Sequence, residues 1–130
     1  MFRNSGGSNF ELGFENNSYS DENGNLKIFY DGFRLGSAVD FNIIENGDTL
    51  NPGKIWKQFQ GGFYPISDGS LFLPPLKNDS LVLLFHLPLE FYTHIPNLYS
   101  PYIYLTIIDI FSNNGKGKVK SKNNIIFSGN

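Results

Sequence analysis

Two almost continuous apolar runs, at residues 81–87 and 101–110, constrain the fold of this chain more than any other feature. Both are rich in aliphatic and aromatic residues, and their lengths suit β-strands better than helices. No stretch shows the 3.6-residue apolar stripe of a helix of three turns. The chain is therefore predicted to be all-β. The two runs are expected to be neighbouring antiparallel strands, because the link between them is long enough for the chain to return.

Clusters of asparagine and glycine divide the rest of the chain into short segments. The sequence holds sixteen Asn and 14 Gly, and both residues tolerate left-handed backbone angles and so mark turns. An Asn-Gly pair within residues 21–25 predicts a hairpin that begins with a strand in which Phe10, Leu12 and Phe14 share one face. The further strands expected, in chain order, are 26–30, 33–35, 70–73 and 118–127. The first two of these would complete a three-stranded meander.

Residues 36–69 form a long connection with poor periodicity, in which only 55–59 could begin a helix. Long connections in compact domains often carry function, so this region is the expected place for a site. Flat aromatic rings can stack on sugars or seat a protein partner. The candidate ligand-binding residues of this loop are Trp56, Phe59, Phe63 and Tyr64. The plainer alternative is that these rings cap the ends of the β-core.

The composition excludes several classes of function. Ten Lys plus Arg against twelve Asp plus Glu give a formal net charge of -2, so the chain as a whole would not attract nucleic acid. It contains no Cys, which removes disulfides, thiolate metal sites and cysteine nucleophiles. No stretch is long and apolar enough for a membrane-spanning helix. An unknown protein or carbohydrate ligand is therefore the expected partner, with no nucleic acid and no membrane span.

The length of 130 residues fits one domain and excludes a multidomain enzyme. We expect a loose lead-in at residues 1–9 and a single all-β domain, or a partial propeller, at 10–130. The lead-in lacks the apolar stretch of a signal peptide. The chain is thus either cytoplasmic or written here without its leader.

Patterns for catalysis and metal binding are scarce. A metal site could be formed by two histidines and a carboxylate, namely His86, Glu90 and His94. Their spacing would need a helix, and Pro88 and Pro96 oppose a helix there. Hydrogen-bonded histidines in strands or loops are the expectation instead. No nucleophile elbow, P-loop or dinucleotide fingerprint is present. The chain is predicted to have no enzymatic activity, no catalytic residue, no metal and no cofactor.

Two charged segments have a structural and a functional interpretation. Residues 21–25 carry several side-chain oxygen atoms, as calcium-binding loops do. The bidentate Glu that follows later in such loops is missing, so a plain turn is favoured. Alternating lysines at 116, 118, 120 and 122 would share one face of a strand and leave Val119 on the other. Such a stripe could attract an anionic polymer, but a solvated edge that discourages aggregation is the favoured interpretation.

The order of these motifs is similar to a known class of proteins. The segments that carry the likeness include GGSNF at 6–10, NGDTLNPG at 46–53, GSLFLP at 69–74, YIYLTIID at 102–109 and NGKGKV at 114–119. Together they resemble the N-terminal portion of large secreted Bacteroidota proteins, which combine a β-propeller-like repeat region with a type IX secretion sorting domain. The resemblance implies the opening blades of a propeller and a secreted or cell-surface location. It implies no catalytic residue.

The predicted function is a non-enzymatic scaffold or binding module that forms part of a larger repeat protein. The alternative is a carbohydrate-binding or glycosidase-related β-domain with the loop 56–64 as its sugar platform. Meanders that radiate from an axis would favour the first hypothesis, and two sheets packed face to face would favour the second. An isolated piece of a propeller is also expected to self-associate, because its outermost strands would lack partners and the lysine stripe protects only one stretch.

Overall fold

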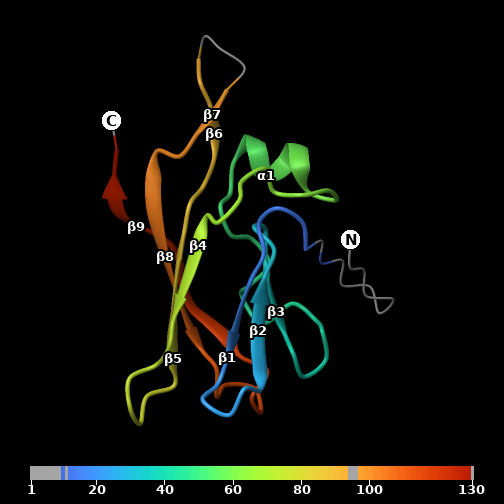
Figure 1. Cartoon of the computed structure of the whole chain (residues 1–130), viewed down its shortest axis with the longest axis vertical. Coiled ribbons are helices and arrows are strands. Elements are labelled where there is room, and N and C mark those ends of the chain that lie inside the picture. Colours follow the sequence, from blue (N-terminus) through green and yellow to red (C-terminus); the bar gives the residue numbers. More distant parts are fainter. Residues whose placement is uncertain (1–9, 11, 94–96, 130) are drawn as a thin grey trace.

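The computed structural model of the chain describes residues 10, 12–93 and 97–129. Within these residues lie two larger antiparallel sheets, a two-stranded hairpin and one short helix (Figure 1). The first sheet has the strand order β1-β2-β3, the second has the order β4-β5-β8-β9, and β6 pairs with β7. The elements are β1 Asn17–Ser20, β2 Leu26–Tyr30, β3 Leu35–Ser37, α1 Lys54–Phe59, β4 Ser70–Leu73, β5 Leu81–His86, β6 Glu90–Phe91, β7 Leu98–Tyr99, β8 Tyr102–Asp109 and β9 Lys118–Ser128.

The first sheet is a three-stranded meander, as the turn signals predicted, although its third strand is Leu35–Ser37 and not the predicted 33–35. Strands β1 and β2 pair antiparallel, and so do β2 and β3. Between β1 and β2 the chain reverses at residues 21–25, where Gly24 has a φ of 80°. This left-handed angle is one that glycine adopts without strain. The Asn-Gly pair was therefore a correct hairpin signal.

The prediction that Phe10, Leu12 and Phe14 belong to the first strand is wrong. Strand β1 begins later, and these three residues do not share a buried face, since Phe10 is fully buried while Phe14 is 67% exposed. The physical reason lies at Glu15, where the chain bends. The buried Glu15 carboxylate accepts a hydrogen bond of 2.8 Å from the Gly69 N–H, next to β4, so the chain turns toward the second sheet at this point.

The second sheet contains the two apolar runs as antiparallel neighbours, which confirms that prediction. On β5 and β8, Leu84 lies opposite Thr106 and Val82 lies opposite Ile108. Every second residue of β5 is buried and the others are only partly covered. The pairing of β8 with β9 contains three irregularities of register, which bend the long outer strand. The small hairpin of β6 and β7 between the runs was not predicted.

The two sheets face each other across a shared core (Figure 1). The core residues that are at most 1% exposed include Ile28, Tyr30, Leu35, Val82, Leu84 and Ile108. The all-β class and the antiparallel pairing are thus confirmed. The propeller arrangement is not confirmed, because two sheets packed face to face are the arrangement of the sandwich alternative.

A second, smaller core lies beside helix α1 and contains Phe33, Ile55, Tyr64 and Leu89. The chain passes very close to Tyr64 at Gly32, which has a φ of 94°, and a Cβ atom at that position would collide with the Tyr64 side chain. The helix confirms the prediction made for residues 55–59. In the described part of the chain, no helix is long and apolar enough to cross a membrane.

Candidate functional site

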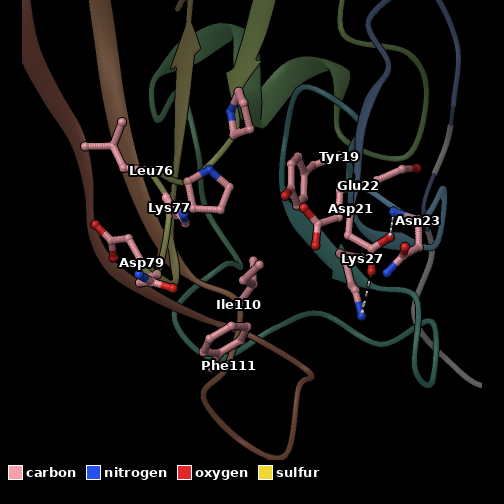
Figure 2. Close-up of a pocket in the computed structure, with 14 residues that line it drawn as sticks. Tyr19, Asp21, Glu22, Asn23, Lys27, Leu76, Lys77, Asp79, Ile110 and Phe111 are labelled. Atoms are coloured by element: carbon pink, nitrogen blue, oxygen red, sulfur yellow. Dashed lines mark hydrogen bonds and ion pairs between the residues drawn. The ribbon is translucent and has the colours of Figure 1, made fainter.

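An open cleft of about 830 Å³ lies at one end of the sandwich, between the β1–β2 turn and the β4–β5 loop. Figure 2 shows Tyr19, Asp21 and Lys27 on one side of this cleft and Leu76 and Lys77 on the other. The residues after β8 lie between the two walls. The volume falls within the range of about 300–1,000 Å³ that is usual for ligand sites.

The wall made by the β1–β2 turn is held rigidly by Asp21. Its Oδ1 accepts hydrogen bonds of 2.9 Å from the N–H groups of Asn23 and Asn25, and its Oδ2 lies 3.5 Å from the Lys27 Nζ. The bond from the Asn25 N–H is the main reason why the pKa of the Asp21 carboxyl lies below its usual value. The turn is therefore a fixed, charged wall. The oxygen atoms of Asp21 are already occupied by the chain itself, as expected of a plain turn.

The opposite wall is the β4–β5 loop, which begins at Pro74 and Pro75. Proline cannot donate to a sheet, so these two residues end β4 and hold the loop away from it. The loop closes at Asp79, whose Oδ1 accepts hydrogen bonds from the N–H groups of Ser80 and Leu81. Leu76 stands at the tip and is 80% exposed. This wall thus offers a large apolar side chain on a constrained backbone.

The floor of the cleft is formed by Ile110 and Phe111, which follow β8. Ile110 is 6% exposed and donates its N–H to the Ser80 carbonyl at 3.0 Å, whereas Phe111 is 70% exposed. The Phe111 N–H donates to Asp109 Oδ1 at 2.9 Å, which fixes the direction of the chain there. A buried apolar residue beside an exposed aromatic ring forms a shallow apolar seat.

The charges around the cleft have both signs. Asp21, Glu22, Lys27, Lys77 and Asp79 all line it. Partial burial and the nearby carboxylates raise the pKa of the Tyr19 phenol, so this hydroxyl stays neutral and can form hydrogen bonds at pH 7. Chemically, the arrangement can seat an apolar group and orient charges beside it.

The residues predicted as an aromatic platform do not form one exposed surface. Tyr64 is 1% exposed, and its hydroxyl accepts a hydrogen bond of 2.8 Å from the Leu89 N–H. Trp56 is partly buried and donates its Nε1–H to the Phe33 carbonyl at 3.2 Å. Phe59 and Phe63 are also partly buried. Phe59 packs on the second core, and the Phe63 ring meets the Phe14 ring edge to face, with centroids 6.0 Å apart.

His86 belongs to a buried polar network that joins the two sheets. Its Nδ1 lies 2.6 Å from Asn51 Oδ1, and its Nε2 lies 2.7 Å from Thr106 Oγ1. Because an amide oxygen can only accept, Nδ1 carries the proton and Nε2 accepts from the threonine hydroxyl. Asn51 donates to the Tyr30 hydroxyl at 2.7 Å, and Thr106 Oγ1 accepts from the Asn123 N–H at 3.2 Å.

Burial lowers the pKa of His86 to about 3, so the ring is neutral at physiological pH. With both nitrogen atoms engaged inside the core, this histidine has the structural role that was expected and cannot reach a substrate. Glu90 is exposed on β6, and His94 lies outside the described residues. Among the residues that the structure describes, no group of three His, Cys, Asp or Glu could hold a metal ion.

Three of the four lysines of the stripe are paired with acidic residues of the same chain. Val119 is 1% exposed, as predicted for the inward position of the strand. The ammonium groups face carboxylates of the segment 40–48, at distances of 3.0–3.2 Å. The pairs are Lys116 with Asp40, Lys118 with Glu45 and Lys122 with Asp48. The stripe therefore attaches a long connection to β9.

The sequence did not predict the cleft. The turn at 21–25 and the end of a strand at residue 73 were each predicted, but nothing in the pattern places these segments opposite each other. Their proximity depends on how the two sheets stack. The one available signal was Phe111, a large apolar residue in a segment of turn residues.

Comparison with protein-family models, with curated proteins and with solved structures found no match. The resemblance to secreted Bacteroidota proteins therefore stays a prediction.

Proposed function

We propose that the protein is a non-enzymatic binding module that holds an extended segment of a partner polypeptide in the cleft. The observation that carries this proposal is an apolar seat with a charged rim. Leu76 and Phe111 stand 80% and 70% exposed at the cleft, and Glu22, Lys77 and Asp79 line it beside them. Exposed aromatic and aliphatic anchors ringed by polar groups are typical of sites for protein partners.

The open shape of the cleft favours a polypeptide over a small molecule. A small ligand would keep much of its surface in water, whereas a chain can insert one apolar side chain and continue along the rim. Asp21 is occupied by its own turn and by Lys27. The remaining charges of the cleft are two carboxylates, Glu22 and Asp79, and one ammonium group, Lys77. This balance favours a partner that carries a basic residue beside its apolar anchor.

The carbohydrate alternative has less support from the geometry. Its proposed platform required flat rings with one face free, and Tyr64 is 1% exposed. The Trp56 indole N–H is bonded to a backbone carbonyl. We therefore place the ligand in the cleft and not on the loop 56–64.

We also propose that this module acts outside the cell, secreted or at the surface, as part of a larger repeat protein. The support is the resemblance to secreted repeat proteins described above. Digestion of intact cells with a protease tests the location. Cleavage of the protein in unbroken cells is expected, and full protection would contradict an extracellular position.

Selection of displayed peptides tests the binding function. A library of random linear peptides is selected on the immobilised chain, and an enriched peptide is titrated by fluorescence anisotropy against Phe111→Ser. We expect this variant to bind at least about tenfold more weakly, because a buried aromatic anchor is lost from the interface. The matched control is Phe127→Ser, since Phe127 is 60% exposed but lies on β9, away from the cleft.

The proposal fails if the selection enriches no peptide above background. It also fails if Phe111→Ser and Phe127→Ser bind the peptide as tightly as the original chain. Soluble oligosaccharides are titrated in parallel, and saturable binding of a sugar that is unaffected by Phe111→Ser would support the alternative function.

A further inference from the structure

A group of tyrosine rings lies at the end of the molecule opposite the cleft. Figure 1 shows the β6–β7 hairpin projecting at this end and the β4–β5 loop at the other. In the hairpin, the Tyr92 and Tyr99 rings are stacked, with centroids 4.6 Å apart. At the start of β8, the Tyr102 and Tyr104 rings are also stacked, with centroids 5.7 Å apart. These four residues are called here the tyrosine cluster.

The tyrosine cluster continues the inner face of the second sheet beyond the core. Tyr104 lies opposite His86, and residues directly opposite each other in an antiparallel sheet point to the same side. The centroids of these two rings are 5.6 Å apart. Whereas His86 is buried, Tyr102 and Tyr104 are only partly buried, and Tyr92 is 48% exposed. The series of rings therefore begins at the core and reaches solvent at the hairpin.

The carboxylate of Glu90, an exposed residue of β6, lies beside these rings. Its Oε2 accepts a hydrogen bond of 3.3 Å from the Tyr99 hydroxyl. Partial burial raises the pKa of the Tyr99 and Tyr104 phenols, and the charge of Glu90 contributes to both shifts. The negative charge therefore acts on rings of both the hairpin and β8. The phenols themselves stay neutral at pH 7.

In the part of the chain that the structure describes, the charge of Glu90 has no cationic partner. The ion pairs there are formed by four other carboxylates, namely Asp21, Asp40, Glu45 and Asp48. The two lysines of the neighbouring helix α1, Lys54 and Lys57, form no ion pair with Glu90 either. Along the sequence, no Lys or Arg occurs between Lys77 and Lys116. Because the faces of aromatic rings are also negative, this surface is complementary to a cation.

A guanidinium group fits this arrangement better than an ammonium group or a sugar. It is planar and weakly hydrated, so it can stack on a ring while its N–H groups donate to a carboxylate. A carboxylate can accept about four hydrogen bonds, and the Tyr99 hydroxyl provides one of those to Glu90. An ammonium group is a strongly hydrated point charge that does not stack. A sugar could lie against the rings, but it would leave the charge of Glu90 without a counterion.

We propose that the tyrosine cluster and Glu90 bind the arginine side chain of a partner polypeptide. The guanidinium group would stack on the tyrosine rings at the hairpin and donate hydrogen bonds to the Glu90 carboxylate. One exposed contact of this kind is weak, so it would add specificity to a larger interface. The site is separate from the cleft and does not depend on the function proposed for it.

A titration of the full chain followed by NMR tests this proposal. The probe is the capped tripeptide acetyl-Gly-Arg-Gly-amide, and the control peptide carries citrulline, a neutral analogue of similar shape, in place of arginine. The ring signals of Tyr92 and Tyr99 are followed up to about 50 mM peptide, which covers the weak affinity of one exposed contact. We expect a saturable shift with the arginine peptide, and binding of the citrulline peptide at least about threefold weaker.

Variants of the chain show which groups hold the peptide. Glu90→Gln removes the charge and keeps an acceptor for the Tyr99 hydroxyl, so we expect binding to weaken at least about threefold. Tyr92→Leu should weaken it similarly, because an exposed ring is lost, whereas Tyr92→Phe keeps the ring and should bind like the original chain. The binding of these variants is followed through Tyr99. Circular dichroism confirms that they are folded.

The matched control for charge is Glu45→Gln, the same substitution at a carboxylate that is 53% exposed. Glu45 pairs with Lys118 at the start of β9, whereas Tyr102 lies opposite Ser128 at the other end of this strand. This variant should bind the arginine peptide like the original chain. Phe111→Ser, which changes the cleft, should also bind it normally.

Three results would overturn the proposal. The first is an absence of any shift of the ring signals, and the second is equal binding of the arginine and citrulline peptides. The third is binding that survives both Glu90→Gln and Tyr92→Leu in folded protein. Cellobiose is titrated in parallel. A saturable shift of the same ring signals by this sugar, unaffected by Glu90→Gln and without binding of arginine, would assign the surface to a carbohydrate and also overturn the proposal.

Discussion

Both faces of the second sheet depart from the usual distribution of polar and apolar side chains. The inner face buries His86 and Thr106 next to Val82 and Leu84. The outer face leaves leucines such as Leu71 in contact with solvent. Two polar side chains thus lie among the apolar ones inside the molecule, while some large apolar side chains lie outside.

The difference teaches that satisfaction of hydrogen bonds, more than polarity itself, decides what can be buried. Every polar atom of the His86 ring has a partner within 2.7 Å, and the ring is neutral. A neutral group whose hydrogen bonds are all made costs little free energy to bury, and this one links the two sheets. The exposed leucines have no such constraint and are available for binding.

The largest expected effect is a difference in unfolding free energy between variants of the two faces. Leu84→Ala removes a fully buried side chain and should lower the free energy of unfolding by about 2–5 kcal/mol. Leu71→Ala on the outer face should change it by less than about 1 kcal/mol, because most of that side chain is already in water. Chemical denaturation of both variants at low protein concentration measures this. Equal losses would show that the outer face is covered in the folded monomer.

The second prediction concerns pH and the neutral His86. The folded state holds its pKa near 3, whereas the unfolded chain has the ordinary value near 6.5. The unfolded state therefore binds the proton first, and stability is lost as pH falls below about 6.5, by about 1.4 kcal/mol per pH unit. Denaturation at pH values from 6.5 down to 5 measures the slope. In His86→Leu the slope should disappear, and an unchanged slope would assign it to another group.

The third prediction contrasts this neutral group with a buried carboxyl. Burial raises the pKa of Glu15, although bonds from Ser70 and Gly69 oppose the shift. A raised folded-state pKa gives stability at low pH that is lost as pH rises through that pKa. Glu15→Gln keeps an acceptor for the Gly69 N–H and removes the charge, so it should stabilise the fold at pH 7 by about 1 kcal/mol or less. The gain should vanish near pH 4 when thermal melts are compared, and a gain that persists there would exclude ionisation as its cause.

The smallest effect is expected where polar groups meet in water. Glu45 and Lys118 form an ion pair of 3.0 Å, and about half of each side chain is exposed. Glu45→Gln should change the free energy of unfolding by less than about 0.5 kcal/mol, and high salt should reduce even this difference. Denaturation in low and high salt provides the measurement. A loss above 1 kcal/mol would mean that the segment 40–48 depends on this pair.

The sequence was informative wherever local chemistry decides the structure. The Asn-Gly turn, the apolar strands β5 and β8 and the inward position of Val119 were all predicted correctly. Strand β1 was missed, because Asn17–Ser20 has no apolar alternation and pairs through its backbone. The alternation at Phe10, Leu12 and Phe14 was misleading, because the contact of Glu15 with Gly69 redirects the chain.

The candidate site was less predictable than the fold. A cleft between two turns requires knowledge of how distant segments stack, and Tyr19 and Phe111 are separated by most of the chain. The outward direction of Leu83 and Ile107 was equally hidden, because strands that are apolar on both faces carry no mark of which face is inside. Such faces are distinguished only by what packs against them.

The attachment of β9 to residues 45–51 also determines when the fold can be completed during synthesis on the ribosome. The Val119 N–H donates to the Glu45 carbonyl, and side chains of Asn46 and Asn123 bridge the same two segments across 73 and 74 residues of sequence. Residues 45–51 therefore cannot form these contacts until β9, more than seventy residues later in the sequence, has been synthesised. Until then β8 lacks its outer neighbour in the sheet, and an unpaired strand edge on a growing chain is prone to aggregation. We expect the growing polypeptide to be most prone to aggregation after β8 has emerged and before β9 has.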